Sequence, residues 1–393
     1  MPRPVDTWLL PEGVADVLPA EAARLEALRR QLLDRFAVWG YQLVFPPLME
    51  YLDSLLTGSG HDLDLMTFKI TDQLTGRMMG VRADITPQVA RLDAHSLLVD
   101  GPARYCYAGT TLNTRPAALA ASRCPVQIGA ELYGYDGVAG DIEILRLMLE
   151  TLTLAGCKNI QLDLGHVAIF RGLARLAGIG GRDESLLFDI YQRKAVAELH
   201  DFLGAQKLPA EMTVCFEGLL KLAGDVSVLT QAKALLGGLA PDIDEALQSL
   251  HTLADALTAS HAGASLYFDL TELRGYHYHT GLVFAAYAPG ARSELAKGGR
   301  YDHVGEAFGR SRPATGFSAD LKTLLAYAAV AAKPSGIFAP AGDAAELQNA
   351  ISALRLQGER VVQALPDDKT SAAGVGCDRV LVLADAKWQV TNS

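Results

Sequence analysis

The sequence predicts an α+β fold: a mostly antiparallel sheet with flanking helices, a helical insertion and a small C-terminal α/β tail. Three observations indicate it. Strand-like segments dominate up to about residue 135, an almost purely helical pattern covers about 167–262, and strand character returns from residue 265. Strands, then a block of helices, then more strands are typical of this class. We therefore expect a core domain over 1–330, which carries the insertion, and a short segment over 335–393.

Composition narrows the class of protein. The 393 residues are 50% hydrophobic and 20% charged, which excludes disordered, collagen-like and coiled-coil chains. No apolar run reaches the ~20 residues that span a bilayer, and the first residues lack the regions of a signal peptide. The net charge of -10 argues against a large nucleic-acid interface. Five scattered cysteines without a CxxC spacing indicate reduced thiols, so we expect a cytoplasmic protein without a membrane partner.

The N-terminal half supplies one long helix and several strands. The helix opens at Pro19 and ends at Gly40, because apolar residues recur on one face at three- and four-residue spacing: Leu25, Leu28, Leu32, Phe36 and Trp39. A short strand over 41–48 is broken by two prolines, which cannot donate to a ladder. Further strands are expected at 67–71, 77–81, 103–108 and 126–135, and a helix at 141–155.

The C-terminal half begins with the helical block, which has Gly and Pro breaks near 178–181, 208–209 and 237–241. Strands are then expected at 265–270, 274–286 and 297–301. After a linker at 333–336, the tail shows strands at 337–338, 360–364 and 379–384 and a helix at 344–356. About 60 residues form a marginal independent domain, so we expect the tail to pack on the main body.

The strand over 126–133 carries the first candidate site. Gln127, Gly129 and Glu131 share one face, because residues two apart on a strand point the same way. A glycine between an amide and a carboxylate would leave a hollow for a small polar or cationic ligand. The alternative is a solvated strand face with an incidental glycine.

The segment 82–87 carries the second candidate. Arg82, Asp84 and Thr86 alternate along a strand that Pro87 ends, and this proline would begin a helix. Asp84 and Thr86 could hydrogen-bond an ammonium group. An Asp-x-Thr-Pro sequence is also a common start of a helix, so the alternative is purely structural.

Two later segments are rich in polar and aromatic groups. On a strand over 274–286, His277 and His279 would share a face like a metal pair, but a metal site needs at least three ligands and no third is spaced for it. We therefore expect no metal and no cofactor. The sequence Gly-Gly-Arg-Tyr-Asp at 298–302 predicts a tight turn that presents its last three side chains.

Because of these motifs and their order along the sequence, the chain resembles histidyl-tRNA synthetase, a class II synthetase, over about 8–328. The matching segments are 10–19, 40–47 (motif 1, the dimer interface of that family), 109–134 (motif 2), and the histidine signatures at 274–284 and 298–302. The resemblance implies a class II synthetase-like antiparallel sheet. It also implies a histidine-type pocket made of Asp84, Thr86, Gln127, Glu131, Arg274, Tyr278 and Tyr301.

The departures from that family concern ATP and tRNA. The motif 2 arginine and glutamate are Leu112 and Thr114, and the motif 3 arginine is Thr323, with Asp320 nearby. Losing one such electrostatic donor lowers a rate about 10²–10³-fold. The tail is also shorter than the family's anticodon-binding domain. In the pocket, the family's Leu-Asp-Tyr-Tyr reads Tyr-His-Tyr-His at 276–279, so histidines replace an aspartate and a tyrosine.

The combination resembles the regulatory-subunit family of ATP phosphoribosyltransferase, which acts in bacterial histidine biosynthesis. The resemblance implies a non-catalytic chain that self-dimerises and activates a short catalytic subunit in a hetero-octamer, with L-histidine as feedback inhibitor and no tRNA bound. Three alternatives remain: a divergent histidyl-tRNA synthetase, another ATP-dependent ligase of synthetase-like fold, and a regulatory chain whose pocket is vestigial. The sequence also leaves open whether histidine binds to this chain, to the catalytic chain or between them.

Overall fold

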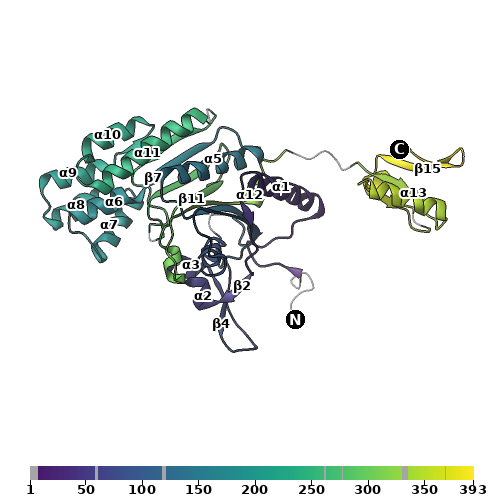
Figure 1. The fold of residues 1–393 in the computed structure, drawn as a ribbon, viewed down its shortest axis with the longest axis horizontal. Coiled ribbons are helices and arrows are strands. Elements are labelled where there is room, and N and C mark those ends of the chain that lie inside the picture. Colours follow the sequence, from purple (N-terminus) through teal and green to yellow (C-terminus); the bar gives the residue numbers. More distant parts are fainter. Residues whose placement is uncertain are drawn as a thin grey trace. The chain divides into compact units, whose positions relative to one another are not determined.

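The computed structural model describes residues 8–57, 61–116, 121–260, 263–276, 278–329, 335–367 and 369–393. The chain divides into two compact units, Met1–Ala328 and Ala329–Ser393 (Figure 1). Within the described ranges, no helix is long and apolar enough to cross a membrane.

The first unit is built on a nine-stranded sheet. Neighbouring strands are antiparallel except for the pairs β1–β5 and β7–β9, which confirms the predicted antiparallel α+β class. In spatial order the strands are β1 (Gln42–Leu43), β5 (Ala103–Thr110), β6 (Val126–Tyr133), β12 (Ala314–Asp320), β11 (Ala296–Arg300), β10 (Leu282–Tyr287), β7 (Gln161–His166), β9 (Ser265–Asp269) and β8 (Ala223–Gly224).

Helices α1 (Pro19–Val38), α5 (Val138–Leu154) and α12 (Leu321–Leu324) pack against this sheet. The predicted face of α1 is confirmed, because Leu28, Leu32 and Phe36 are buried in the main core. The helix ends where Gly40 adopts a left-handed φ of 85°, which a glycine reaches without strain.

Strands β3 (Phe68–Thr71) and β4 (Met78–Val81) confirm two further predictions. They form a separate antiparallel sheet with β2 (Met49–Tyr51), in the order β2–β4–β3. The neighbouring short helices are α2 (Leu52–Leu56), α3 (His61–Met66), α4 (Thr86–Arg91), the π-helix η2 (Leu92–Leu97) and the 3₁₀ helix η3 (Val304–Phe308).

The region expected to be helical gathers beside β7 (Figure 1). The predicted breaks fall between its helices, which are α6 (Val167–Leu176), α7 (Arg182–Gln192), α8 (Val196–Gln206), α9 (Ala210–Leu219), α10 (Ser227–Leu236) and α11 (Pro241–Ser260). We call residues 167–260 the helical block. Strand β8 interrupts it and joins the main sheet beside β9.

The second unit is a four-stranded sheet in the order β14–β13–β15–β16, with the helix α13 (Ala345–Leu356). Its core consists mainly of Ile337, Leu347, Ile351 and Leu381. The elements are β13 (Ile337–Ala339), β14 (Val361–Gln363), the 3₁₀ helix η4 (Ala373–Val375), β15 (Arg379–Ala384) and β16 (Lys387–Asn392). Strand β16 was not expected, and the packing of this unit on the first stays a prediction.

Candidate functional site

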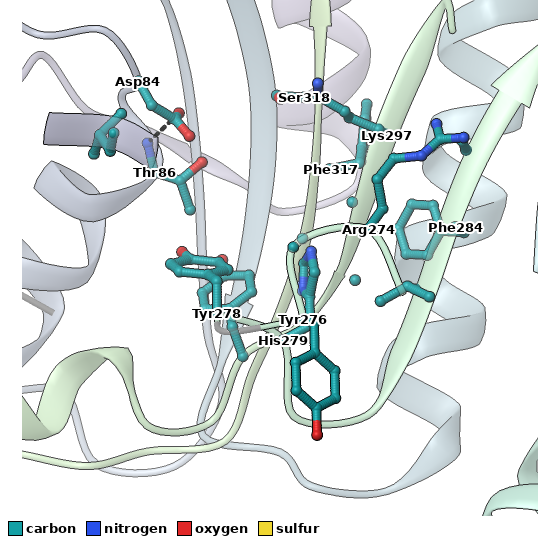
Figure 2. Close-up of a pocket in the computed structure, with 18 of the residues that line it drawn as sticks. Asp84, Thr86, Arg274, Tyr276, Tyr278, His279, Phe284, Lys297, Phe317 and Ser318 are labelled. Carbon is teal, nitrogen blue, oxygen red and sulfur yellow. Dashed lines mark hydrogen bonds between the residues drawn. The ribbon is translucent and has the colours of Figure 1, made fainter. Parts of the chain in front are cut away.

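A cavity of about 660 Å³ lies over the main sheet (Figure 2). Strands β6, β10, β11 and β12, helix α7, the turn before α4 and the loop 272–279 supply its lining. The structure brings all seven predicted pocket residues into this lining: Asp84, Thr86, Gln127, Glu131, Arg274, Tyr278 and Tyr301.

Glu131 is the most enclosed charged group of the cavity, with 1% of its surface exposed. Its Oε1 lies 3.0 Å from the hydroxyls of Thr86 and Tyr107, and its Oε2 accepts a hydrogen bond from the Tyr301 hydroxyl. Within the described residues, no basic side chain forms an ion pair with it. The carboxyl group is therefore held by neutral donors alone.

This environment disfavours the charged form of Glu131. Burial raises the pKa of its carboxyl group to about 8, and the nearby Asp84 carboxylate adds to the rise. The three hydroxyl hydrogen bonds oppose the shift without cancelling it. A cationic group placed in the cavity would stabilise the carboxylate and supply the missing partner.

Asp84 and Gln127 fix the turn that leads into α4. The Gln127 side chain donates to Asp84 Oδ1 over 2.7 Å and accepts from the Ile85 N–H over 2.9 Å. Asp84 Oδ1 also accepts from the Thr86 N–H over 3.0 Å. The carboxylate is thus oriented by neutral groups.

The expectation of a strand through 82–86 is wrong, because β4 ends at Val81. Pro87 does stand in the first turn of α4, as predicted. Arg82 is buried and donates to the carbonyl oxygens of Pro46 and Thr110, over 2.8 and 2.9 Å. Its guanidinium therefore binds backbone and does not line the cavity.

The hollow expected over Gly129 is filled. Tyr107 pairs with Gly129 across β5 and β6, and a Cβ at Gly129 would lie 2.5 Å from the Tyr107 hydroxyl oxygen. The glycine thus admits the tyrosine that binds Glu131. Sequence reasoning missed Tyr107, since only the strand register places it there.

Arg274 lies on a loop, which corrects the predicted strand over 274–286: β10 begins only at Leu282. Gly275 has a φ of 63°, a turn conformation that favours glycine. The Arg274 guanidinium is 3.1 Å from Glu272 Oε2, and its backbone N–H donates to Glu272 Oε1. The same loop brings Tyr278 to the cavity, where its ring packs at a tilt against the Tyr301 ring, with the centroids 5.1 Å apart.

His279 lies before β10 and not on a strand, so the expected strand face with a histidine pair is not formed there. His277 lies outside the described residues. His279 Nδ1 is 3.2 Å from the Arg300 carbonyl oxygen. Burial lowers the pKa of His279 to about 4, so its ring is neutral near pH 7. In the described part of the chain, no three His, Cys, Asp or Glu side chains gather as metal ligands would.

The glycine pair at 298–299 forms part of β11, which confirms the strand expected at 297–301 and corrects the tight turn expected at 298–302. A Cβ at Gly299 would lie 2.5 Å from the Leu282 carbonyl oxygen, so the glycines permit close approach between strands. Arg300 is buried and pairs with Asp141 at 3.0 Å, which secures β11 to α5. Tyr301 follows and reaches Glu131.

The positions that depart from the synthetase motifs are occupied by neutral or capping groups. Thr114 donates to the Leu65 carbonyl oxygen over 2.6 Å, and Thr323 donates to Asp320 over 2.9 Å. Asp320 also caps α12 by accepting from the Lys322 N–H. Among the described lining residues, the positively charged side chains are Arg274 and Lys297, and each pairs with a glutamate.

Comparisons with known proteins agree with this fold. Residues 13–324 match the family model described as "Histidyl-tRNA synthetase", and residues 334–391 match "ATP phosphoribosyltransferase subunit HisZ C-terminal domain". The ATP phosphoribosyltransferase regulatory subunits of Thioalkalivibrio sulfidiphilus and Pseudomonas aeruginosa are each 55% identical over 389 residues, covering 98% of both chains.

Solved structures are similar over nearly the whole chain. An ATP phosphoribosyltransferase regulatory subunit/histidyl-tRNA synthetase from Bacillus halodurans superposes with a TM-score of 0.83 at 26% identity, covering 97% of this chain and 99% of that one. A histidyl-tRNA synthetase from Nostoc superposes with a TM-score of 0.78 at 16% identity, covering 98% and 97%, which supports the fold alone.

Proposed function

The chain belongs to the family of ATP phosphoribosyltransferase regulatory subunits, and from this premise we propose that it binds L-histidine and thereby regulates a separate short catalytic subunit. It is a regulatory subunit of histidine biosynthesis and not itself the enzyme. Histidine bound in the cavity would inhibit the assembled transferase. This requires that histidine prefer the inhibited state, because an effector shifts an equilibrium only by its differential affinity.

The pair of carboxyl groups over the sheet carries this proposal. Asp84 and Glu131 both line the cavity, and their hydrogen-bond donors in the described structure are neutral. An amino acid with a nitrogenous ring offers an ammonium and ring N–H groups to such acceptors, and charge-assisted bonds of this kind are the strong ones. Its carboxylate would meet Arg274. The buried Tyr278 hydroxyl, which has no partner in the described structure, would be available to the same ligand.

The ATP-binding chemistry of a synthetase is disfavoured. Adenylation concentrates charge on the α-phosphate and depends on prepositioned cations. Leu112 and Thr323 stand where the resemblance places two arginines, and the Thr323 hydroxyl is held by Asp320. We therefore propose that the chain neither forms an adenylate nor binds tRNA.

We also propose how the complex assembles. The chain dimerises through motif 1, and four regulatory chains combine with four catalytic chains. Large exposed apolar side chains at and beside motif 1 support the dimer, and Phe45 is 71% exposed there. The neighbouring Leu43, Leu48 and Met49 are exposed as well. Five free cysteines agree with a reducing, cytoplasmic compartment.

Titration calorimetry of the purified full chain with L-histidine and, separately, with ATP tests the proposal. Histidine should bind and ATP should not. ATP binding followed by pyrophosphate release with histidine would instead make this an adenylating enzyme. In the complex with the catalytic subunit, Glu131→Lys should abolish inhibition by histidine and leave the uninhibited rate unchanged. Unaltered inhibition would mean that the cavity is vestigial.

A further inference from the structure

His279 occupies a fixed place in the cavity wall. Figure 2 shows its imidazole ring between Tyr278 and Arg274. A Cβ at Gly275 would lie 2.8 Å from His279 Cδ2, and a Cβ at Gly299 would lie 2.8 Å from its Nδ1 and Cε1. The ring therefore fits because both of these neighbours are glycines, and they leave it little freedom to turn.

The proton of this ring can be assigned from its partner. Nδ1 faces the Arg300 carbonyl oxygen at 3.2 Å, and a carbonyl oxygen only accepts hydrogen bonds. Nδ1 must therefore carry the hydrogen. Burial lowers the pKa of the ring to about 4 and keeps it neutral near pH 7; the hydrogen bond to Arg300 opposes this shift, and the charges of Arg171 and Lys297 add to it. Nε2 consequently holds a lone pair and can only accept.

A fixed acceptor differs from the tyrosine that the synthetase resemblance places at this position. A tyrosine hydroxyl rotates and can either donate or accept, so it tolerates a ligand nitrogen with or without a hydrogen. Nε2 of His279 tolerates only a donor. If a ligand atom that cannot donate lay opposite Nε2, the nitrogen would lose its water without gaining a hydrogen bond, which weakens binding.

We propose that His279 is a specificity-determining residue, whose Nε2 accepts a hydrogen bond from a ring N–H of the ligand. This inference rests on the proposed function, because it presumes an imidazole-bearing amino acid in the cavity. In this proposal, Asp84 and Glu131 attract the positive charge of the ligand, and His279 selects a ligand whose ring carries an N–H.

Two histidine analogues provide the probe. In 3-(4-thiazolyl)-L-alanine and 3-(5-thiazolyl)-L-alanine, sulfur takes the place of one or the other ring nitrogen and the remaining nitrogen carries no hydrogen, so neither ring can donate a hydrogen bond. Calorimetry on the wild-type full chain should show both isomers binding about 10- to 100-fold more weakly than L-histidine, as expected for a lost buried hydrogen bond. His279→Phe should weaken the binding of histidine and bring the ratio of each analogue's dissociation constant to that of histidine to within about threefold.

His279→Gln, which restores an acceptor oxygen, should recover part of the discrimination. Ser318→Ala removes a hydroxyl from another part of the lining and should leave the ratio unchanged. Thermal unfolding of each variant identifies those that fail to fold. If the wild type binds histidine and His279→Phe keeps full discrimination, the role of His279 is overturned and the sensor function stands. If the wild type does not bind histidine, both are overturned.

Discussion

The two sides of the cavity are built differently. The side on the sheet presents Glu131 and Tyr301, which are 1% and 2% exposed and lie in a network of hydroxyl groups. The opposite side is the loop 272–279 with α7, where the Arg274 side chain is 41% exposed and already paired with Glu272. The buried side therefore has the larger influence on ligand chemistry, because electrostatic interactions are strongest where water is excluded.

The loop side is also attached to the helical block. The Tyr276 ring packs against Phe170 and Phe188 at centroid distances of 5.3 and 5.2 Å, and the Arg171 guanidinium lies 4.6 Å from its centroid. Its hydroxyl donates to Glu184 of α7. Since Ser185, Phe188 and Asp189 of the same helix line the cavity, the helical block supplies part of the wall.

Glu131→Gln tests the sheet side and should have the largest effect. The variant keeps the shape of the side chain and removes the charge, so the dissociation constant for L-histidine should rise about 10- to 100-fold, as one charge-assisted bond is worth about 1.5–3 kcal/mol. Calorimetry measures it. Glu143→Gln is the matched control, because Glu143 also accepts from a tyrosine hydroxyl, that of Tyr41, but does not line the cavity. Equal losses in both variants would contradict a special role for Glu131.

The raised pKa of Glu131 predicts that histidine binding is linked to proton release. A cation beside the carboxylate favours its ionised form, so binding at pH 7 should release close to one proton from a group with a pKa of about 8. The affinity should increase about fivefold between pH 7 and 8. Calorimetry in buffers of different ionisation enthalpy counts the protons. An absence of release would mean that Glu131 stays protonated and donates to the ligand.

The same pKa shift makes the stability of the unliganded chain fall as the pH rises, whereas the affinity for histidine rises. The folded-state pKa of Glu131 is raised from 4.5, so its contribution to stability is fully present below about pH 4.5 and is lost as the pH rises through about 8. Urea unfolding should show the wild type losing stability relative to Glu131→Gln between pH 6 and 8.5. A difference that does not change with pH would contradict the shift.

The sequence could predict which side chains meet on the sheet side. The period of two in β6 places Gln127 and Glu131 on one face, and Pro87 marks the start of α4 beside Asp84. The position of Tyr107 over Gly129 could not be predicted, because it depends on the register between β5 and β6. The glycines at 298–299 were misread, since glycine serves both tight turns and close strand contacts.

The loop side could be predicted less well. Aromatic and β-branched residues over 274–286 favoured a strand, but tertiary contacts hold Tyr276 against the helical block instead. The wall that α7 contributes comes from residues about 90 positions earlier in the chain, and no local pattern in the sequence pairs these segments.

Arg274→Gln tests the loop side directly. An ion pair that is two-fifths exposed contributes modestly, and Glu272 already occupies the guanidinium, so the dissociation constant for histidine should rise only about two- to fivefold. Arg193→Gln is the control, because this exposed arginine pairs with Glu198 outside the cavity. A loss as large as that of Glu131→Gln would remove the distinction between the two sides.

Tyr276→Phe should have the smallest effect on binding. The variant keeps the packing against Phe170 and Phe188 and loses the hydroxyl that donates to Glu184, and Figure 2 shows that hydroxyl directed away from Arg274 and His279. The dissociation constant for histidine should change less than about twofold, because the lost hydroxyl is directed away from the ligand-binding groups. Tyr41→Phe, which removes a comparable bond to Glu143, is the control.

Hydrogen exchange of the backbone amides over 182–192 gives a second measurement on the wild type and Tyr276→Phe. Histidine should protect α7 in the wild type, because three of its residues line the cavity. Tyr276→Phe should bind histidine as tightly but protect α7 less, since the hydroxyl that ties the loop to Glu184 is gone. If the variant instead lost tenfold in affinity, the loop would position the ligand as strongly as the sheet does. The two sides of the cavity would then act as one unit.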